Sequence, residues 1–419
     1  MEISEHNLEL QPRERQVLRR LAEQVAEIAA LPVQAERARL WQKMNALQAE
    51  RPLVLANPQN GWCELIADEE LFCSHPLMRG WEMTLRRLVY HHQHIPDDWP
   101  VTNRFDVNWV IDAGSYGLQE IQVRSEERGS YTWDAPINTI ADLEKLHQRE
   151  IRIDHALTAQ HRALAEDILG DLLPVRLMGE SMCRAKLMRV LIHLRGFQQM
   201  LLDMYDNPQL LHNLLAFLRD DFLNEWQVYE REGVLTLNNQ PDSLMGSGSL
   251  GHTDHLPADD YSGKVRMQDM WCWGEAQELV GVGPWQFDEF VLQYQLPLMN
   301  RFGLVDYGCC EPLDQKFDLI IRQIPRLRSV AVSPWCNRKI AAEKLGNQYV
   351  YVWKPNPTTI CMPQLDLAAA EKDIQDTLAI TKGCNLVIAM KDTSTFNREP
   401  WRITRWTELA SRLAASAAE

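Results

Sequence analysis

The sequence has no long hydrophobic run, no excess of positive charge and no signal segment. No apolar run in the 419 residues approaches the about 20 residues that a membrane-spanning helix requires. The formal net charge is -15, whereas nucleic-acid-binding proteins carry basic patches. Residues 1–15 are polar and charged, unlike a secretory signal peptide. We therefore expect no membrane span, no nucleic-acid partner and no secretory signal.

The sequence also lacks a disulfide framework. Its nine cysteines are odd in number and scattered along the chain. This arrangement suits a reducing cytoplasm, in which thiols act as ligands rather than as disulfides. We find no internal repeat and no low-complexity linker. The sequence therefore predicts a cytoplasmic protein with free thiols.

What is present is a regular alternation of strand-like and helix-like segments. Eight apolar, β-branched segments predict strands, at 105–111, 173–178, 233–238, 267–273, 302–307, 328–333, 348–353 and 385–391. Helical patterns lie between most of them, at 155–169, 186–231, 284–300, 314–324, 336–345 and 366–381, and a last helix is expected at 400–416. Strands that alternate with helices indicate parallel βαβ units, and eight of them close a barrel. The predicted fold is an α/β protein, a (β/α)8 TIM barrel over residues 101–419.

Residues 1–100 are expected to form a helical and mixed extension of the barrel. Two amphipathic helices are predicted at 13–30 and 34–49, separated by Pro32. An open doubly wound sheet is the alternative to the barrel, but no Gly-rich phosphate loop follows any predicted strand.

Polar and reactive residues follow nearly every predicted strand. The carboxyl ends of the strands carry the active sites of TIM-barrel enzymes, so we expect these residues to form a ring at the barrel mouth. The ring consists of Glu180, Asn239, Glu275, Gln277, Cys309, Cys310, Glu311, Trp335, Cys336, Lys354, Lys391 and Asp392.

The most informative segment is the run 305–312, which reads Val-Asp-Tyr-Gly-Cys-Cys-Glu-Pro. It places Cys309, Cys310 and Glu311 directly after a predicted strand. Thiolates and carboxylates are zinc ligands, and adjacent cysteines rarely form a disulfide with each other. We expect a thiol-ligated metal at this position. A structural pair of buried cysteines is the alternative, because free cysteine packs well in cores.

A Gly-, Ser- and Asp-rich segment lies between Asn239 and Val265. Loops of this length without secondary structure are usually functional or disordered. We expect this segment to form a lid over the barrel mouth. His252 and His255 have the spacing H-x-x-H, but on a lid they are expected to lie at the surface or contact substrate rather than metal.

Two stretches carry a family resemblance. They are 174–179, Pro-Val-Arg-Leu-Met-Gly, and 195–212, in which a polar turn ending in Pro208 leads into a Leu-rich helix. In these stretches the chain resembles the uroporphyrinogen decarboxylase superfamily. The segments 303–312, 333–335, 353–357 and 391–393 look closer to its cobalamin-dependent methyltransferase branch, which acts with corrinoid proteins and includes the O-demethylase type. The resemblance runs roughly from residue 170 to 410.

The resemblance implies a bound zinc ion, held in that branch by a His-x-Cys pair and a later Cys. Here Tyr307 stands where the His would be, followed by Gly308, Cys309 and Cys310. Glu275 or Glu311 would then replace the missing imidazole. Candidates for the later ligand are Cys384, which precedes the last predicted strand, and Cys336.

The implied activity is methyl transfer between a small methylated substrate, of the methoxyaryl ether or methylamine type, and a corrinoid protein. Zinc would stabilise the leaving group or bind a thiol acceptor. Cobalamin would come with the partner, because the chain has no Asp-x-His-x-x-Gly run. Residues placed as general acids are Glu180, Tyr307 and Asp392. Residues expected to contact substrate are Asn239, His252, Trp273, Gln277, Trp335, Lys354 and Lys391, because tryptophan faces favour flat or cationic groups and lysines favour anions.

Two other functions remain open at this stage. One is a lyase that decarboxylates an acid without metal, although residues 1–60 lack the Arg-rich signature of true uroporphyrinogen decarboxylases. The other is a barrel without enzymatic activity that binds a methylated molecule or a partner.

Overall fold

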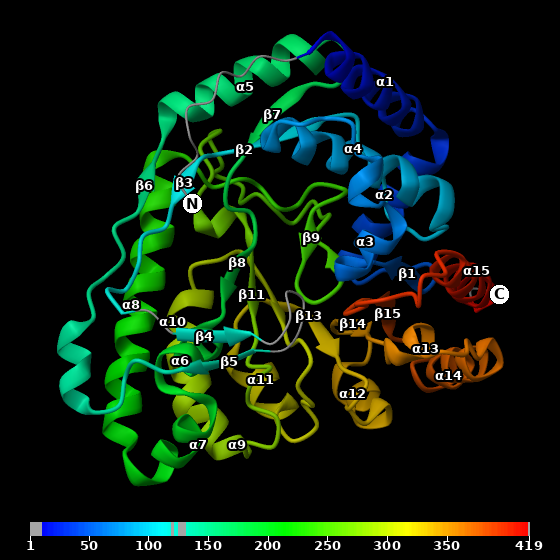
Figure 1. Ribbon diagram of the computed structural model, residues 1–419. Helices are drawn as coiled ribbons and strands as arrows, with labels where there is room; N and C mark the ends of the chain where they lie inside the picture. The colour runs from blue at the N-terminus through cyan, green and yellow to red at the C-terminus, as the bar shows by residue number, and fades with distance from the viewer. Residues whose placement is uncertain (1–10, 119–120, 125–130, 418–419) are drawn as a thin grey trace.

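A computed structural model describes residues 11–118, 121–124 and 131–417, and its centre is a parallel sheet of seven strands (Figure 1). The strands follow in the order β1 (Leu53–Ala56), β15 (Asn385–Met390), β14 (Val350–Trp353), β13 (Leu327–Val332), β12 (Leu304–Tyr307), β11 (Trp271–Gly274) and β8 (Cys183–Ala185). Every neighbouring pair in this sheet is parallel. All seven carboxyl ends therefore lie at one edge.

Helices connect the strands, as expected for an α/β protein. They are α6 (Leu187–Arg195), α7 (Phe197–Asp206) and α8 (Pro208–Glu232) after β8, α9 (Pro284–Phe287), the π-helix η5 (Asp288–Leu292) and α10 (Gln293–Met299) after β11, α11 (Phe317–Gln323) after β12, α12 (Arg338–Leu345) after β13, α13 (Thr358–Cys361) and α14 (Leu367–Ile380) after β14, and α15 (Trp401–Ser416) after β15. Local signals set several ends: Pro208 begins α8 and Gly233, in the left-handed region at φ 72°, ends it.

Both faces of the sheet are apolar, which explains the nearly continuous hydrophobic strands in the sequence. Side chains on the outer face, such as Val332 and Ile388, share a core with the helix residues Leu345 and Trp406. Side chains on the inner face form a separate core, whose strand members are Leu53, Leu55, Val350, Val352, Val387 and Ala389.

A second layered unit lies beside the sheet. The helices α1 (Pro12–Ala29), α4 (Pro76–His94) and α5 (His155–Leu169) share a hydrophobic core with the parallel pair β2 (Phe105–Asn108) and β7 (Val175–Met178). The helix predicted at 13–30 is confirmed as α1, and its apolar residues Leu18, Leu21, Val25 and Ile28, which lie on one face at helical spacing, are all buried.

The strand prediction needs three corrections. Segments 105–111 and 173–178 form the separate β2–β7 pair instead of joining the central sheet, and 233–238 contributes only a bridge from Leu235 to Glu180. Their places are taken by β8 and by β1, a four-residue strand inside the expected N-terminal extension. β8 reads Cys-Arg-Ala and carries a charge at its centre, and β1 lies outside the regular alternation of strands and helices, so neither showed the expected strand pattern. In the described residues, no strand joins the free edges of β1 and β8.

The remaining elements are short or cap the sheet. They are α2 (Pro32–Asn45), α3 (Trp62–Leu65), the antiparallel pairs β3 (Ile111–Asp112) with β6 (Arg152–Ile153) and β4 (Ile121–Arg124) with β5 (Tyr131–Asp134), and the 3-10 helices η1 (Gln59–Gly61), η2 (Asp68–Glu70), η3 (Ile140–Lys145) and η4 (Met267–Asp269). Among the described helices, none combines the length and the apolar character needed to cross a membrane.

The segment predicted as a lid contains a hairpin that packs against the inner face of the sheet. We call residues 244–250 the inserted hairpin; it consists of β9 (Leu244–Met245), a turn and β10 (Ser249–Leu250). A side chain at Gly246 would meet Asp306, and one at Gly248 would meet Ala389. Glycines therefore allow the backbone to approach the strands closely. The inserted hairpin therefore packs on the inner face of the sheet instead of forming a lid over the carboxyl edge.

Candidate functional site

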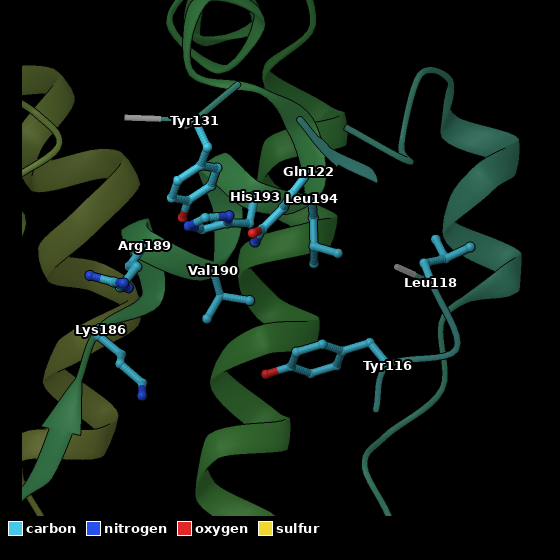
Figure 2. Close-up of a pocket in the computed structure, with 9 residues that line it drawn as sticks. All are labelled: Tyr116, Leu118, Gln122, Tyr131, Lys186, Arg189, Val190, His193 and Leu194. Atoms are coloured by element: carbon cyan, nitrogen blue, oxygen red, sulfur yellow. The ribbon is translucent and has the colours of Figure 1, made fainter. Parts of the chain in front are cut away.

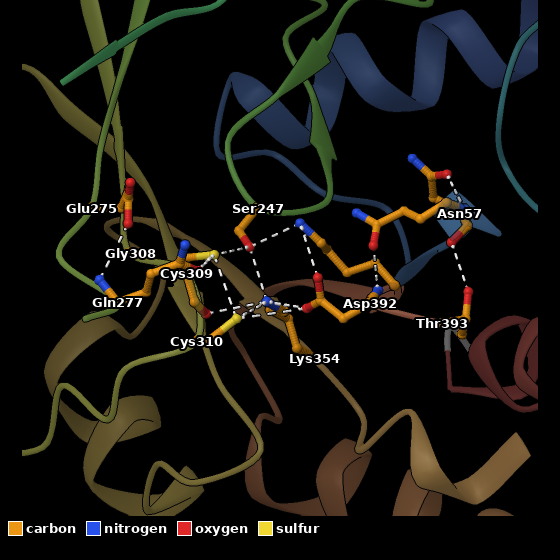
Figure 3. Close-up of polar contacts among 12 residues, drawn as sticks. Asn57, Ser247, Glu275, Gln277, Gly308, Cys309, Cys310, Lys354, Asp392 and Thr393 are labelled. Atoms are coloured by element: carbon orange, nitrogen blue, oxygen red, sulfur yellow. Dashed lines mark hydrogen bonds and ion pairs between the residues drawn. The ribbon is translucent and has the colours of Figure 1, made fainter. Parts of the chain in front are cut away.

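Two groups of polar residues lie at the carboxyl edge of the central sheet. One lines a cavity beside the end of β8 (Figure 2), and the other surrounds the thiols that follow β12 (Figure 3). Among the residues that the sequence singled out, the second group contains Cys309, Cys310, Gln277, Lys354, Lys391 and Asp392.

The two adjacent thiols lie close together after a sharp turn. Gly308, at φ 102°, follows β12, and its amide donates to the carbonyl of Gly274 at the end of β11. The Sγ atoms of Cys309 and Cys310 are 3.6 Å apart. Cys309 is buried, whereas Cys310 is half-buried. The Sγ of Cys309 also lies 3.1 Å from Oε1 of Gln277.

The two thiols differ in acidity. A hydrogen bond from Cys309, helped by the nearby charge of Lys354, lowers the pKa of Cys310 to about 7 against the effect of burial. The same hydrogen bond, together with burial, raises the pKa of Cys309. At neutral pH the pair therefore holds one proton on Cys309 and a substantial fraction of thiolate on Cys310.

Lys354 is the central cation of the site (Figure 3). It follows β14 and is only 2% exposed. Its Nζ lies 2.8 Å from Oδ2 of Asp392, 3.4 Å from Sγ of Cys310 and 3.3 Å from the carbonyl oxygen of Cys309. Burial acts to lower the pKa of Lys354, but the two thiols and Asp392 outweigh it and raise the pKa. The lysine is therefore a permanent positive charge between the carboxylate and the thiols.

Asp392 and Lys391 complete this charge cluster at the end of β15. Asp392 adopts a left-handed backbone conformation with φ 61°, and its amide donates to Oε1 of Gln59. Burial acts to raise the pKa of Asp392, but the ammonium groups of Lys354 and Lys391 lower it. Oδ2 of Asp392 lies 3.7 Å from Sγ of Cys310.

The tip of the inserted hairpin reaches this cluster. Ser247 is 1% exposed, and its Oγ lies 3.0 Å from Nζ of Lys354, 3.3 Å from Nζ of Lys391 and 3.2 Å from Sγ of Cys309. One hydroxyl therefore joins three strands. Sequence reasoning did not single out Ser247; its signal is the pattern Gly246-Ser247-Gly248, in which two glycines free the backbone for a close approach.

Two glutamates expected as zinc ligands have other partners. Glu275 forms an ion pair of 2.8 Å with Arg184, which in turn stacks 4.1 Å above the ring of Trp273. Glu311 accepts from the backbone amides of Ala276 and Cys309, and burial raises its pKa to about 7. Both side chains are fully buried, so they tie the ends of β8, β11 and β12 together.

Asp306 is a buried carboxyl group that the sequence analysis did not assign. It lies on the inner face of β12, faces Gly246 of the inserted hairpin and is 1% exposed. Neither carboxyl oxygen has a hydrogen-bond partner within the described residues. Burial raises the pKa of Asp306 to about 7. Its signal in the sequence is a single acidic residue inside an apolar strand.

Several predicted site residues lie away from the thiols. The hydroxyl of Tyr307 donates to Gln295 on the helix side of the sheet, because side chains alternate along a strand. Glu180 lies before β8 and accepts from the amide of Met182. Trp335 is 66% exposed at the rim.

Three other predicted residues lie at the opposite, amino edge. Cys384 directly precedes β15, so the length of that strand separates it from the cluster. Nδ1 of His252 donates to the carbonyl of Asn239, and the side-chain amide of Asn239 donates to the carbonyl of Leu256, so both residues hold the base of the long loop. Trp273, in contrast, stays at the site; its Nε1 donates to the carbonyl of Gly308.

The remaining question is whether these residues form a metal site as they stand. In the described part of the chain, no group of three His, Cys, Asp or Glu side chains is placed to hold a metal ion. Cys336, the second candidate for a later ligand, accepts from the amide of Leu313. The structure thus brings together Cys309, Cys310, Gln277, Lys354, Lys391 and Asp392, and leaves out Cys384.

Comparisons with known proteins add no family to this picture. No family model matches the chain, and no curated protein matches it.

Proposed function

We propose that the chain is a zinc-dependent methyltransferase that moves a methyl group between a small methylated substrate and a corrinoid protein. The observation that carries this proposal is the Cys309–Cys310 pair at the carboxyl edge of a parallel sheet, where α/β enzymes place their active sites. The methylated substrate belongs to the methoxyaryl ether or methylamine type. Cobalamin comes with the partner corrinoid protein.

The donor atoms fit zinc in part. Zinc–sulfur bonds of about 2.3 Å at a tetrahedral angle put two sulfurs about 3.8 Å apart. The 3.6 Å between Cys309 and Cys310 is close to that separation. These two thiols would hold the ion, and the carboxylate of Asp392, 3.7 Å from Sγ of Cys310, would supply a third ligand. When bound, zinc would act as a Lewis acid on the leaving atom or on a thiol acceptor.

The chain's own residues support this chemistry electrostatically. Lys354 stabilises the thiolate of Cys310 and keeps Asp392 ionised. Lys391 lies 5.9 Å from the ring of Trp273, so an anionic, flat substrate finds a cation and an aromatic face together. The inserted hairpin closes the inner side of the sheet beside Cys309, which is buried.

The proposal includes a finer fold and location. The seven-stranded sheet would be a (β/α)8 barrel; the support is the parallel pairing of all seven strands and the parallel bridge between Leu235 and Glu180, just before β8. Free thiols throughout the described chain fit a cytoplasmic protein.

A second candidate is a metal-free lyase that decarboxylates a small acid. It is favoured by two buried lysines, Lys354 and Lys391, which converge on Ser247 and could bind a carboxylate. The two functions differ in their need for zinc.

The test measures bound zinc together with methyl transfer. The full chain, purified after expression with zinc, is expected to hold about one zinc per chain and to methylate a Co(I) corrinoid with at least one compound from a panel of methoxyaryl and methylamine donors. Cys309→Ser and Cys310→Ser should each lose the metal and the activity. Cys384→Ser is the matched control, because that thiol lies at the other edge, and it should keep both.

Three outcomes would contradict the proposal. A chain without zinc that releases carbon dioxide from small acids supports the lyase. Equal loss of zinc in the Cys384→Ser variant would place the metal elsewhere. Unchanged zinc and turnover in both Cys309→Ser and Cys310→Ser would mean that these thiols only pack.

A further inference from the structure

A cavity of about 550 Å³ lies beside the carboxyl end of β8 (Figure 2). Pockets for small molecules commonly measure about 300–1,000 Å³, so it has room for one small ligand. Its walls come from the segment before β4, from the β4–β5 pair and from α6. The lining residues are Tyr116, Leu118, Gln122, Tyr131, Lys186, Arg189, Val190, His193 and Leu194.

The polar part of this cavity is cationic. Lys186 is the first residue after β8, and Arg189 lies one turn later on α6. Burial, with the charge of Arg184, lowers the pKa of Lys186, and the carboxylates of Glu225 and Glu180 oppose this only in part. Neither Lys186 nor Arg189 forms an ion pair with a carboxylate in the described residues. Two cations at one cavity wall provide a binding place for an anion.

The other walls are aromatic and apolar. His193 stacks on Trp133 at 4.9 Å and on Tyr131 at 6.4 Å, which makes a flat surface on one side. Tyr116 faces Lys186 from the opposite side, with its hydroxyl and the ammonium group directed toward the space between them (Figure 2). Val190 completes the apolar lining. A planar ring fits these walls better than an aliphatic chain.

The cavity is connected to the thiols by a chain of contacts. Lys186 follows Ala185, whose neighbour across the sheet is Gly274, the residue before Glu275. Glu275 pairs with Arg184 and accepts from the amide of Gln277. Gln277 in turn contacts Cys309. The cavity and the thiols thus share one edge of the sheet.

We infer that this cavity binds a small aromatic carboxylate. The carboxylate lies between Lys186 and Arg189, and the ring lies between Tyr116 on one side and the stacked Tyr131 and His193 on the other. As the substrate subsite of the enzyme, this assignment rests on the proposed function; as a binding site, it can be tested alone.

The test is isothermal titration calorimetry of the full chain with three probes. Benzoate is expected to bind with one site per chain. Benzamide lacks the charge and should bind at least about tenfold more weakly, since a hydrogen bond to a charged group contributes about that much. Acetate lacks the ring and should be weakened by a similar factor, because it forgoes the burial of an aromatic face. Lys186→Gln and Arg189→Gln should each weaken benzoate by a similar factor. Lys372→Gln, a surface lysine paired with Asp376, is the control and should leave binding unchanged.

The outcomes separate this inference from the proposed function. Benzoate affinity that is equal in wild type, Lys186→Gln and Arg189→Gln would overturn the inference, as would equal affinity for benzamide. Arg189 is exposed, so its variant keeps the test valid if Lys186→Gln unfolds. Lys186-dependent benzoate binding in a chain without zinc or methyl transfer would uphold the cavity and refute the methyltransferase. Zinc binding and methyl transfer without benzoate binding would support the methyltransferase and refute the assignment of the cavity.

Discussion

Cys310 and Cys384 are both half-buried thiols, but they lie at opposite edges of the same sheet and differ in acidity. Cys310 follows β12, where Cys309 and Lys354 lower its pKa to about 7. Cys384 precedes β15, where burial alone raises its pKa. Exposure is similar, so the difference comes from the neighbours that each edge provides. The position of a thiol along its strand decides whether it is reactive.

The long loop shows the same contrast within one segment. Its base, at Asn239 and His252, makes hydrogen bonds that hold the amino edge together. Its tip, at Ser247, contacts the charged cluster at the carboxyl edge. The long loop therefore connects the amino edge of the sheet, where its residues have structural roles, with the charged cluster at the carboxyl edge.

The largest effect is expected from a side chain on the inserted hairpin. In Gly246→Ala the new methyl group would collide with the carboxyl group of Asp306, and the backbone φ of 59° is unfavourable for alanine. We expect the free energy of unfolding to fall by about 3 kcal/mol from overpacking and left-handed strain together. Gly233→Ala is the matched control: φ is 72° and nothing lies near the added group, so the loss should be about 1 kcal/mol. Urea unfolding measures both. Equal losses would show that the hairpin does not pack tightly on the sheet.

The next effect concerns the reactivity of the two thiols. At pH 7 about half of Cys310 is thiolate, against about one in a hundred for a thiol at the ordinary pKa of 9.0. The lower nucleophilicity of an acidic thiolate reduces this advantage, so in the zinc-free chain iodoacetamide should modify Cys310 about five to ten times faster than Cys384. Peptide mass spectrometry over pH 5 to 9 gives the two rates. If the alkylation rate of Cys310 has its pH midpoint near 9, the proposed difference in acidity between Cys310 and Cys384 does not exist.

Lys354→Met should reduce the difference in alkylation rate between Cys310 and Cys384, because it removes the cation that stabilises the thiolate of Cys310. The midpoint for Cys310 is expected to move to higher pH. Lys382→Met, which changes a lysine beside Cys384 at the amino edge, is the control and should leave Cys310 as it was. A midpoint unaffected by Lys354→Met would assign the acidity to Cys309 alone.

The last prediction concerns the pH dependence of stability that Asp306 contributes. Its pKa rises from 3.8 to about 7 on folding, so the native state retains a proton that the unfolded state has lost. The stabilisation is complete below about pH 4 and decreases as the pH rises to about 7. Asp306→Asn should flatten this decline in urea unfolding between pH 4 and 8. Asp254→Asn, which changes an exposed carboxyl group at the amino edge, should retain the decline. If stability falls equally with pH in the wild type and in both variants, the raised pKa of Asp306 is refuted.

Much of the outer architecture could be predicted from the sequence. The helix at 155–169 has the predicted bounds, and those at 366–381 and 400–416 differ from the structure by a residue, because their apolar periodicity and caps are local signals. The strands at the centre of the sheet were found for the same reason. β8 was missed because Arg184 interrupts its apolar pattern, and β1 because it lies outside the regular alternation of strands and helices. Residues 233–238 were assigned to a strand because their apolar run is buried, but they form only a single bridge.

For the site, the sequence alone determined that thiols, lysines and carboxylates follow the strands, since the order of residues along a parallel strand fixes the edge at which they emerge. It could not determine which of them meet. Only the tertiary structure turned Tyr307 toward the helices, engaged Glu275 and Glu311 with Arg184 and backbone amides, and brought Ser247 from a distant loop onto Lys354. The physical reason is that such contacts depend on side-chain direction and on packing between segments far apart in the chain, which no local pattern encodes.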